Sequence, residues 1–202
     1  MKSFIIFINI YVGLIWGGGM VYAGEMTIES LMSALAITQH AEQTFTERRY
    51  SELLTRPLVF RGMLRYKKPD YLEKHVQTPR DQRFIIKGDT LTVERNEQGK
   101  RVKHVISLEG FPIMAALTQG LRATMAGDQA QLEKLFTLEL SGTYRKWHLL
   151  LTPRPEDDPE NDETLADVIE AMKLSGDAQH VLRVEIIEKE GDRSVMVINP
   201  RP

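Results

Sequence analysis

A series of short segments with a two-residue period, each followed by a short polar turn, constrains the fold of this chain most strongly. In residues 58–66, the apolar Phe60 and Leu64 fall on one side, and Arg61 and Arg65 fall on the other, as in a strand with one buried face. Further strands are predicted over residues 71–77, 83–86, 91–95 and 102–107. Short polar turns join antiparallel neighbours, so the pattern predicts an antiparallel meander.

The segment before these strands is predicted to be a helix over residues 27–49, with Thr27 as its N-cap. Its apolar side chains follow the i, i+3, i+4, i+7 spacing of one helix face: Ile28, Leu31, Met32 and Leu35. Two more helices are expected after the meander. One begins at Pro112 and ends at Gly127, and a shorter one opens at Asp128 and runs to residue 135.

The C-terminal part of the chain returns to strands, over residues 136–140, 144–151, 181–188 and 194–199. Between them we expect an acidic, proline-containing loop over 153–162 and a fourth helix over 163–174, closed by Ser175 and Gly176. The count of about eight to eleven strands and three or four helices predicts a single α+β domain. The first helix and the helical pair after the meander are the expected cover of the sheet's inner face.

Residues 1–23 have the pattern of a secretory signal peptide. Lys2 is their only charged residue, an apolar segment covers residues 4–16, and small residues precede a cleavage site after Ala23. This apolar segment is shorter than the roughly 20 residues that span a bilayer, which disfavours the alternative of an uncleaved anchor. The sequence therefore predicts export to the periplasm and one mature domain over residues 24–202.

Motifs for catalysis or metal binding are absent from the sequence. It has no cysteine, which excludes disulfides, a thiol nucleophile and a cysteine-linked lipid anchor. Its five histidines are isolated, and it has no nucleophile elbow, P-loop or dinucleotide-binding fingerprint. A lipid-modifying hydrolase would need a nucleophile and base that no motif supplies. The formal net charge of −2 gives no indication of nucleic-acid binding. Because the catalytic and cofactor-binding motifs are missing, we expect no enzyme and no cofactor.

Apolar side chains on the predicted helices and strands instead indicate a binding surface, because methionine and leucine suit variable apolar cargo. The predicted lipid-binding residues are Leu31, Met32, Leu35, Phe60, Leu64, Val93, Met114, Leu117, Leu121 and Met125. A closed core and a lipid cavity share this sequence pattern, so both alternatives stay open at this point.

Short motifs in a fixed order resemble the periplasmic lipoprotein carrier family LolA. They are Gly-Met-Leu-Arg-Tyr-Lys-Lys-Pro at 62–69, Thr-Pro at 78–79 and Lys-Gly-Asp-Thr-Leu at 87–91. The resemblance spans residues 31–199 and is closer to a divergent branch than to the main carrier. It implies a half-open antiparallel β-barrel with amphipathic helices covering its concave face. That apolar face would take up acyl chains and carry a lipidated or otherwise apolar cargo toward the outer membrane.

The resemblance also implies partners and one gating residue. The partners are an acylated cargo, an inner-membrane exporter and an outer-membrane acceptor, with the carrier itself a monomer. The family arginine linked to lid opening and cargo release falls on Lys68, which keeps the charge but loses the planar guanidinium fork. A periplasmic sensor or assembly factor that binds a protein partner is the alternative function on the same scaffold.

Overall fold

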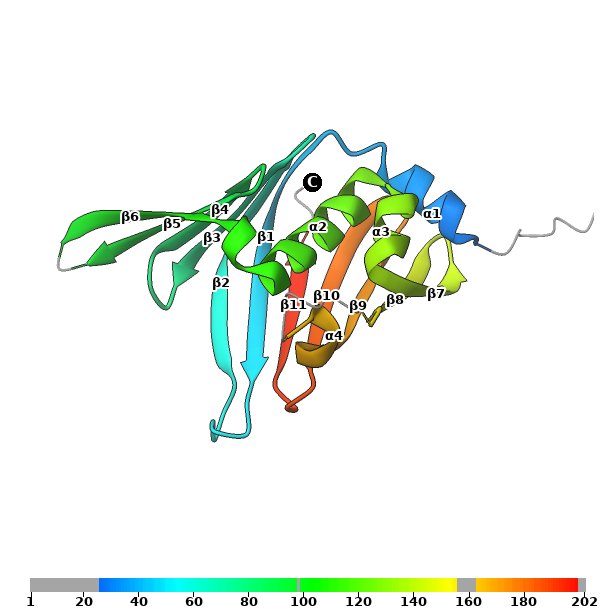
Figure 1. The fold of residues 1–202 in the computed structure, drawn as a ribbon. Helices are drawn as coiled ribbons and strands as arrows, with labels where there is room; N and C mark the ends of the chain where they lie inside the picture. Colours follow the sequence, from blue (N-terminus) through cyan, green and yellow to red (C-terminus); the bar gives the residue numbers. More distant parts are fainter. Residues whose placement is uncertain (1–25, 98, 156–162, 200–202) are drawn as a thin grey trace, which may run out of the picture.

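The computed structural model describes residues 26–97, 99–155 and 163–199, and its framework is one large antiparallel sheet (Figure 1). In these residues the strands are β1 (His40–Tyr50), β2 (Leu58–Lys67), β3 (Tyr71–Thr78), β4 (Gln82–Lys87), β5 (Thr90–Glu97), β6 (Lys100–Ser107), β7 (Phe136–Thr143), β8 (Lys146–Pro153), β9 (Ile169–Asp177), β10 (His180–Glu188) and β11 (Arg193–Asn199). Their order is β6-β5-β4-β3-β2-β1-β11-β10-β9-β8-β7, so β6 and β7 are edges and the sheet does not close. The predicted half-open barrel is confirmed.

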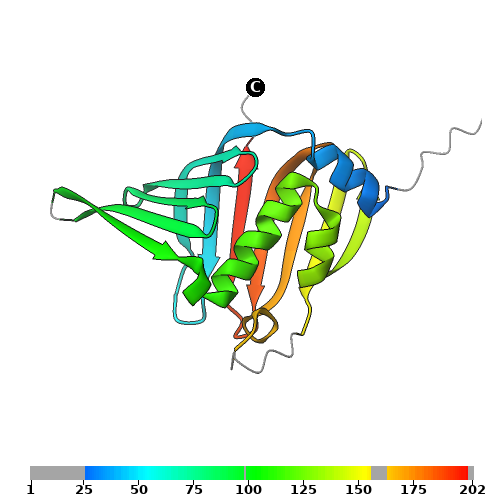
Figure 2. The same ribbon diagram turned by 45° about the horizontal axis from the view of Figure 1, so that its top comes forward.

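The helices lie on one face of this sheet, which we call the concave face (Figures 1 and 2). They are α1 (Ile28–Leu35), η1 (Leu108–Gly110), α2 (Pro112–Ala126), α3 (Gln129–Leu135) and α4 (Leu165–Val168). The predicted helix-end residues Thr27, Pro112, Gly127 and Asp128 are confirmed. Thr27 caps α1 by accepting from the Ser30 amide, Gly127 ends α2 with φ of 70°, and the Asp128 side chain accepts from the Gln131 amide at 3.0 Å.

The prediction of a helix over residues 27–49 is wrong beyond Leu35. The chain leaves α1 and enters β1 at His40. The strand β1 pairs with β2 on one side and with β11 on the other. After Leu35 the helical spacing of apolar residues stops, and Ile37 is exposed. Thr44, Phe45 and Thr46 favour a strand, and hydrogen bonding to two neighbouring strands decides the conformation.

The predicted helix over 163–174 is also wrong for most of its length. Only Leu165–Val168 is helical, and β9 follows at once between β8 and β10. Gly176, expected to stop this helix, lies inside β9, where an added Cβ would come within 1.9 Å of the His180 carbonyl oxygen and 2.4 Å of the Trp147 ring. The position therefore needs a glycine because both the neighbouring strand and Trp147 approach it closely. Part of the expected acidic loop, residues 156–162, lies outside the described residues, as does the predicted signal peptide.

One half of the sheet carries a closed core. The buried cluster joins α1, α2 and α3 to β7–β11, with Trp147, Leu149, Leu151, Met172 and Leu174 among its fully or nearly fully buried members. We call β7–β11 the closed half and β2–β6 the open half. The strand β1 pairs with β11 and β2, so it joins the two halves. The open half is the part of the sheet with apolar surface left to contribute to a site.

Candidate functional site

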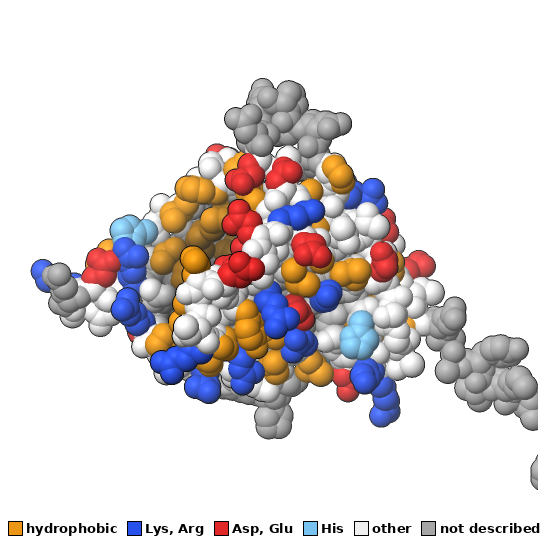
Figure 3. Space-filling view, turned by 90° about the horizontal axis from the view of Figure 1, so that it is seen from below, with side chains coloured by type: hydrophobic (Ala, Val, Ile, Leu, Met, Phe, Trp, Pro, Cys, Tyr) orange, Lys and Arg blue, Asp and Glu red, His pale blue; other side chains and the backbone are white. Residues whose placement is uncertain are grey.

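The concave face of the open half carries apolar side chains that the core does not cover completely. Residues paired across neighbouring strands lie on the same face of the sheet. Starting from Leu174 in the core, the pairs through β10, β11 and β1 therefore identify the residues of β2–β6 on the concave face. By this register the apolar residues of the open half on the concave face are Leu58, Phe60, Leu64, Tyr66, Leu72, Val76, Phe84, Ile86, Leu91, Val93, Val102 and Ile106. Figure 3 shows a hollow lined by hydrophobic side chains toward the β5–β6 end of the molecule.

The helices are fixed to this half of the sheet at the turn between β4 and β5. Arg122 of α2 donates to the Gly88 carbonyl, and the Leu108 amide of η1 donates to the Asp89 carbonyl at 2.8 Å. Two large apolar side chains next to these anchors, Phe111 and Met114, are exposed. The helices are therefore anchored to the open half of the sheet, and they carry exposed apolar side chains close to the anchors.

The ten predicted lipid-binding residues fall into three groups. Leu31, Met32 and Leu35 are buried in the closed core. Leu64, Leu117 and Met125 are half-buried and pack against that core. Phe60, Val93, Met114 and Leu121 lie outside the cluster, and Met114 is 39% exposed. Phe60, Val93, Met114 and Leu121 are therefore the predicted residues best placed to contact a lipid, because the buried group of Leu31, Met32 and Leu35 has no surface left for a ligand.

A charged cluster lies on the same concave face, between the closed and open halves. Its centre is Glu47 on β1, whose side chain is only 2% exposed. One carboxylate oxygen accepts from Lys74 on β3, and the other accepts from Arg49 at 2.9 Å and from the Ser194 hydroxyl at 2.7 Å. We call these four residues the Glu47 cluster. Lys74 reaches its partner across the whole width of β2.

The cations of the Glu47 cluster lie over aromatic rings. The Lys74 ammonium is 5.4 Å from the centroid of Phe45, and the Arg49 guanidinium carbon is 5.3 Å from that of Phe60. Burial by itself raises the pKa of the Glu47 carboxyl, but the Lys74 ammonium and the Arg49 guanidinium outweigh it, so the pKa lies below its ordinary 4.5. Burial lowers the pKa of Lys74, and Glu47 only partly offsets this.

The sequence analysis missed the Glu47 cluster because it placed Glu47 and Arg49 in a helix. One signal was available: Lys74 lies between Leu72 and Val76 at two-residue spacing, so a lysine shares a strand face with two apolar residues. Such a lysine needs a partner when that face is covered. The sequence gives no means of choosing the partner, which is 27 residues away.

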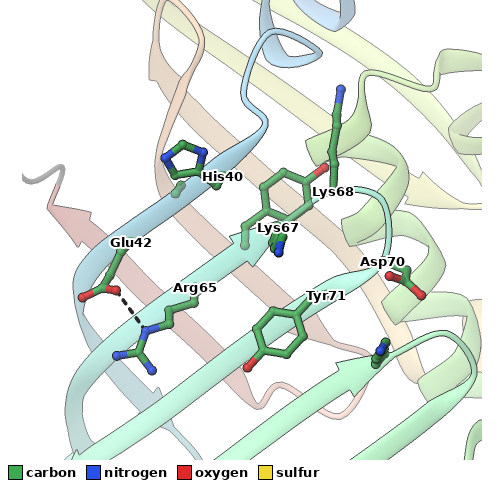
Figure 4. A pocket seen from close by; sticks show the side chains of 10 residues that line it. His40, Glu42, Arg65, Lys67, Lys68, Asp70 and Tyr71 are labelled. Atoms are coloured by element: carbon green, nitrogen blue, oxygen red, sulfur yellow. Dashed lines mark hydrogen bonds and ion pairs between the residues drawn. The ribbon is translucent and has the colours of Figure 1, made fainter.

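Lys68, the predicted gating residue, contacts the end of α1. Its ammonium donates to the Ala36 carbonyl at 2.6 Å, and its amide donates to the Gln39 carbonyl at 3.0 Å. Figure 4 shows its side chain pointing away from Arg65 and Tyr71. Lys68 therefore links the corner between β2 and β3 to the helix that covers the closed half. Its role in gating stays a prediction.

A cavity of about 590 Å³ lies beside this corner, lined mainly by polar side chains of the opposite, convex face (Figure 4). Arg65 donates to Glu42 and Glu73, at 3.0 Å each, and the Tyr71 hydroxyl donates to Glu73 at 2.6 Å. Burial and the Glu73 carboxylate raise the pKa of Tyr71 to about 12. These contacts fasten β1, β2 and β3 together. Among the described residues no group of three potential metal ligands occurs.

Comparisons with known proteins found one family and several solved structures to which this chain is similar. The model of a family described as "Outer membrane lipoprotein carrier protein LolA-like" matches residues 23–199. A LolA superfamily protein from Nitrosomonas europaea is 13% identical, with 86% of this chain and 92% of that chain covered and a TM-score of 0.43. A search of curated proteins found no match. None of the helices in the described residues is long and apolar enough to cross a membrane.

Two further solved structures are similar to this chain. The MucA/MucB complex of Pseudomonas aeruginosa shows 14% identity and a TM-score of 0.45, with 87% of this chain covered but only 58% of that chain. A DUF1329 family protein from Desulfovibrio piger shows 10% identity and a TM-score of 0.33, with 85% and 88% covered.

Proposed function

Because the chain belongs to the LolA-like family of outer membrane lipoprotein carrier proteins, we propose that it is a periplasmic carrier. It binds the acyl chains of a lipidated or otherwise apolar cargo and moves that cargo toward the outer membrane. The observation that supports this proposal most is the hollow on the concave face, lined by hydrophobic side chains (Figure 3). Burial of an acyl chain contributes about 0.8 kcal/mol per methylene, so an apolar hollow suffices for binding without any chemistry.

The open half of the sheet is the part that receives the acyl chain in this proposal. Phe84, Ile86 and Val93 are half-buried there and lie outside the cluster that packs α1, α2 and α3 against the closed half. Partly exposed apolar side chains on a concave surface are the usual lining of a lipid site. The predicted contacts Phe60 and Val93 lie on this half of the sheet, and Met114 and Leu121 lie on α2 outside the closed core, in which Leu31, Met32 and Leu35 are buried.

The remaining parts of the proposal concern the route of the protein and its cargo. Cleavage after Ala23 leaves a single soluble domain that acts as a monomer. An inner-membrane exporter loads this domain, and an outer-membrane acceptor receives the cargo from it. Neither step requires a cofactor, because transfer from one apolar surface to another involves no bond making.

A pair of matched valine substitutions tests the site. Val93 on β5 lies on the concave face of the open half, while Val105 on β6 is 63% exposed on the convex face. We expect Val93→Asp to abolish uptake of a fluorescent acyl probe, because a carboxylate in the hollow is costly to desolvate. Val105→Asp should leave uptake unchanged. Far-UV circular dichroism of both variants shows whether the sheet is intact.

Two results would count against the carrier proposal. The first is equal uptake by the two folded variants, which would remove the hollow from the binding reaction. The second is wild-type protein that takes up no probe and purifies without lipid by mass spectrometry. The second result, together with cross-linking to a protein partner, would favour the alternative of a sensor or assembly factor.

A further inference from the structure

The Glu47 cluster holds one more positive charge than negative charge. Glu47 supplies one carboxylate, whereas Lys74 and Arg49 supply two cations to it. Ser194 is neutral and only donates to the carboxylate. Since Glu47 is 2% exposed and accepts from three donors, its capacity is largely used. The surplus of positive charge is therefore carried by the outer parts of the two cations.

Those outer parts remain accessible and have hydrogen-bond donors to spare. The Lys74 side chain is 24% exposed, and the Arg49 side chain is 57% exposed. Arg49 uses its Nε for Glu47, and no acceptor for its two terminal nitrogens occurs among the described residues. Lys74 has three N–H donors, and its hydrogen bond to Glu47 uses one of them. An incoming anion would thus find a ready set of charged donors.

The cluster is placed where the head of an amphiphile would come to lie. Arg49 is at the C-terminal end of β1, on the side from which Figure 3 views the hollow. Phe60 and Lys74, beside it on β2 and β3, share the concave face with Phe84 and Val93 further out. An acyl chain on Phe84 and Val93 can therefore run along the same face to a head group at Arg49 and Lys74.

From this charge balance and placement we infer that the concave face binds an anionic amphiphile. Its carboxylate or phosphate lies against Arg49 and Lys74, while its acyl chain occupies the open half of the sheet. Glu47 holds the two cations apart and in position as an internal counterion. The inference rests on the proposed lipid-binding function and adds the chemical class of the head group.

A purely structural role for the cluster does not account for its composition as well. A buried ion pair costs about as much in desolvation as it gains, and an apolar pair of similar volume would serve the fold equally. A single Glu–Lys pair would also satisfy both charges. The second cation, Arg49, exceeds what charge balance with Glu47 requires, and it is the more exposed of the two.

The test compares ligands that share a palmitoyl chain and carry an anionic or a neutral head group. Palmitic acid, methyl palmitate and palmitoyl lysophosphatidic acid each compete with a fluorescent acyl probe for the wild-type protein. We expect at least one acid to compete about tenfold better than the ester, the gain typical of a charged hydrogen bond at a partly exposed site. The more effective acid identifies carboxylate or phosphate as the preferred group.

Variants on β1 provide a matched pair, because Arg48 and Arg49 are neighbours on opposite faces of the sheet. Arg49→Gln should remove most of the preference for the acid over methyl palmitate. Arg48→Gln should change neither. Glu47→Gln leaves two cations without their counterion and should increase the preference for the acid, a result that a structural role does not produce.

The outcomes separate this inference from the proposed function. Equal competition by acids and ester overturns the anionic head group while the protein remains an acyl carrier. Absence of competition by all three ligands, with no probe uptake, overturns the carrier function as well. A preference for acid that survives unchanged in folded Arg49→Gln also overturns the assignment to this cluster.

Discussion

Replacing Lys68 with methionine is expected to loosen the attachment of α1 to the sheet. The Lys68 ammonium donates to the carbonyl of Ala36, the C-cap residue of α1, at 2.6 Å. The last turn of α1 contains no basic residue, so Lys68 brings a positive charge to this helix end from the corner between β2 and β3. Methionine keeps the length of the side chain but removes the donor and the charge. The backbone bond from residue 68 to Gln39 is left in place.

The size of the effect follows from the exposure of the contact. A hydrogen bond from a charged donor contributes about 1.5–3 kcal/mol when buried, and the interaction with the helix end adds up to about 1 kcal/mol. Because Lys68 is only half-buried, screening by solvent reduces the sum to about 1 kcal/mol. Leu31, Met32 and Leu35 stay buried, so α1 remains docked. The free energy of unfolding should fall by about 1 kcal/mol, and amide exchange in α1 should rise about fivefold.

Urea unfolding and hydrogen exchange measured by mass spectrometry test this prediction. Lys67→Met is the matched control, because Lys67 is exposed and its side chain lines the convex cavity. It should change neither the unfolding midpoint nor exchange in α1. Identical exchange of α1 in the two variants would refute the proposed link between Lys68 and the helix. Lys68→Arg retains a charged donor and should stay close to wild type.

Two further predictions concern stability. Leu31→Ala removes a side chain that is 0% exposed in the core and should lower the free energy of unfolding by about 3 kcal/mol, whereas Met114→Ala at the exposed rim should cost less than about 1 kcal/mol. Equal losses in urea unfolding would contradict the division into closed and open halves. The second prediction is acid sensitivity. Glu47 and Glu73 have pKa values below 4.5 in the folded state, so the unfolded chain takes up protons more readily. The two carboxylates therefore contribute to the free energy of unfolding at neutral pH, and this contribution is lost as the pH falls through their lowered pKa values. Below about pH 5 the urea concentration at the unfolding midpoint should decrease. A midpoint that is constant down to about pH 3 would show that these carboxylates contribute no net stability.

Local signals account for the parts of the fold that were predicted correctly. Short polar turns separate the strands predicted over residues 83–86, 91–95 and 102–107, which the structure confirms as β4, β5 and β6. Thr27 and Asp128 mark helix starts because their side chains accept hydrogen bonds from backbone amides three residues later. Gly127 marks the end of α2 because it readily adopts the left-handed conformation found there. These interactions are contained in a short stretch of sequence, so they can be recognised there.

The errors arose where pairing between distant segments outweighs local preference. Residues 40–49 and 169–174 have compositions compatible with a helix, yet each forms a strand held by neighbours on both sides. The Glu47 cluster was missed for the same reason. Its serine and its carboxylate are 147 residues apart in the chain and become neighbours only when β11 pairs with β1.

The sequence by itself determined an antiparallel α+β fold and the chemical character of its inner face, because alternation and turn chemistry are local properties. The resemblance of its motifs to the LolA family added the half-open barrel. Only the tertiary structure decided which apolar residues are closed core and which line a hollow. Leu31 and Val93 carry the same apolar signal in the sequence, but α1 is packed into the core while the concave face of β5 is left partly uncovered. That difference depends on where the helices cross the sheet, which is a property of the whole chain.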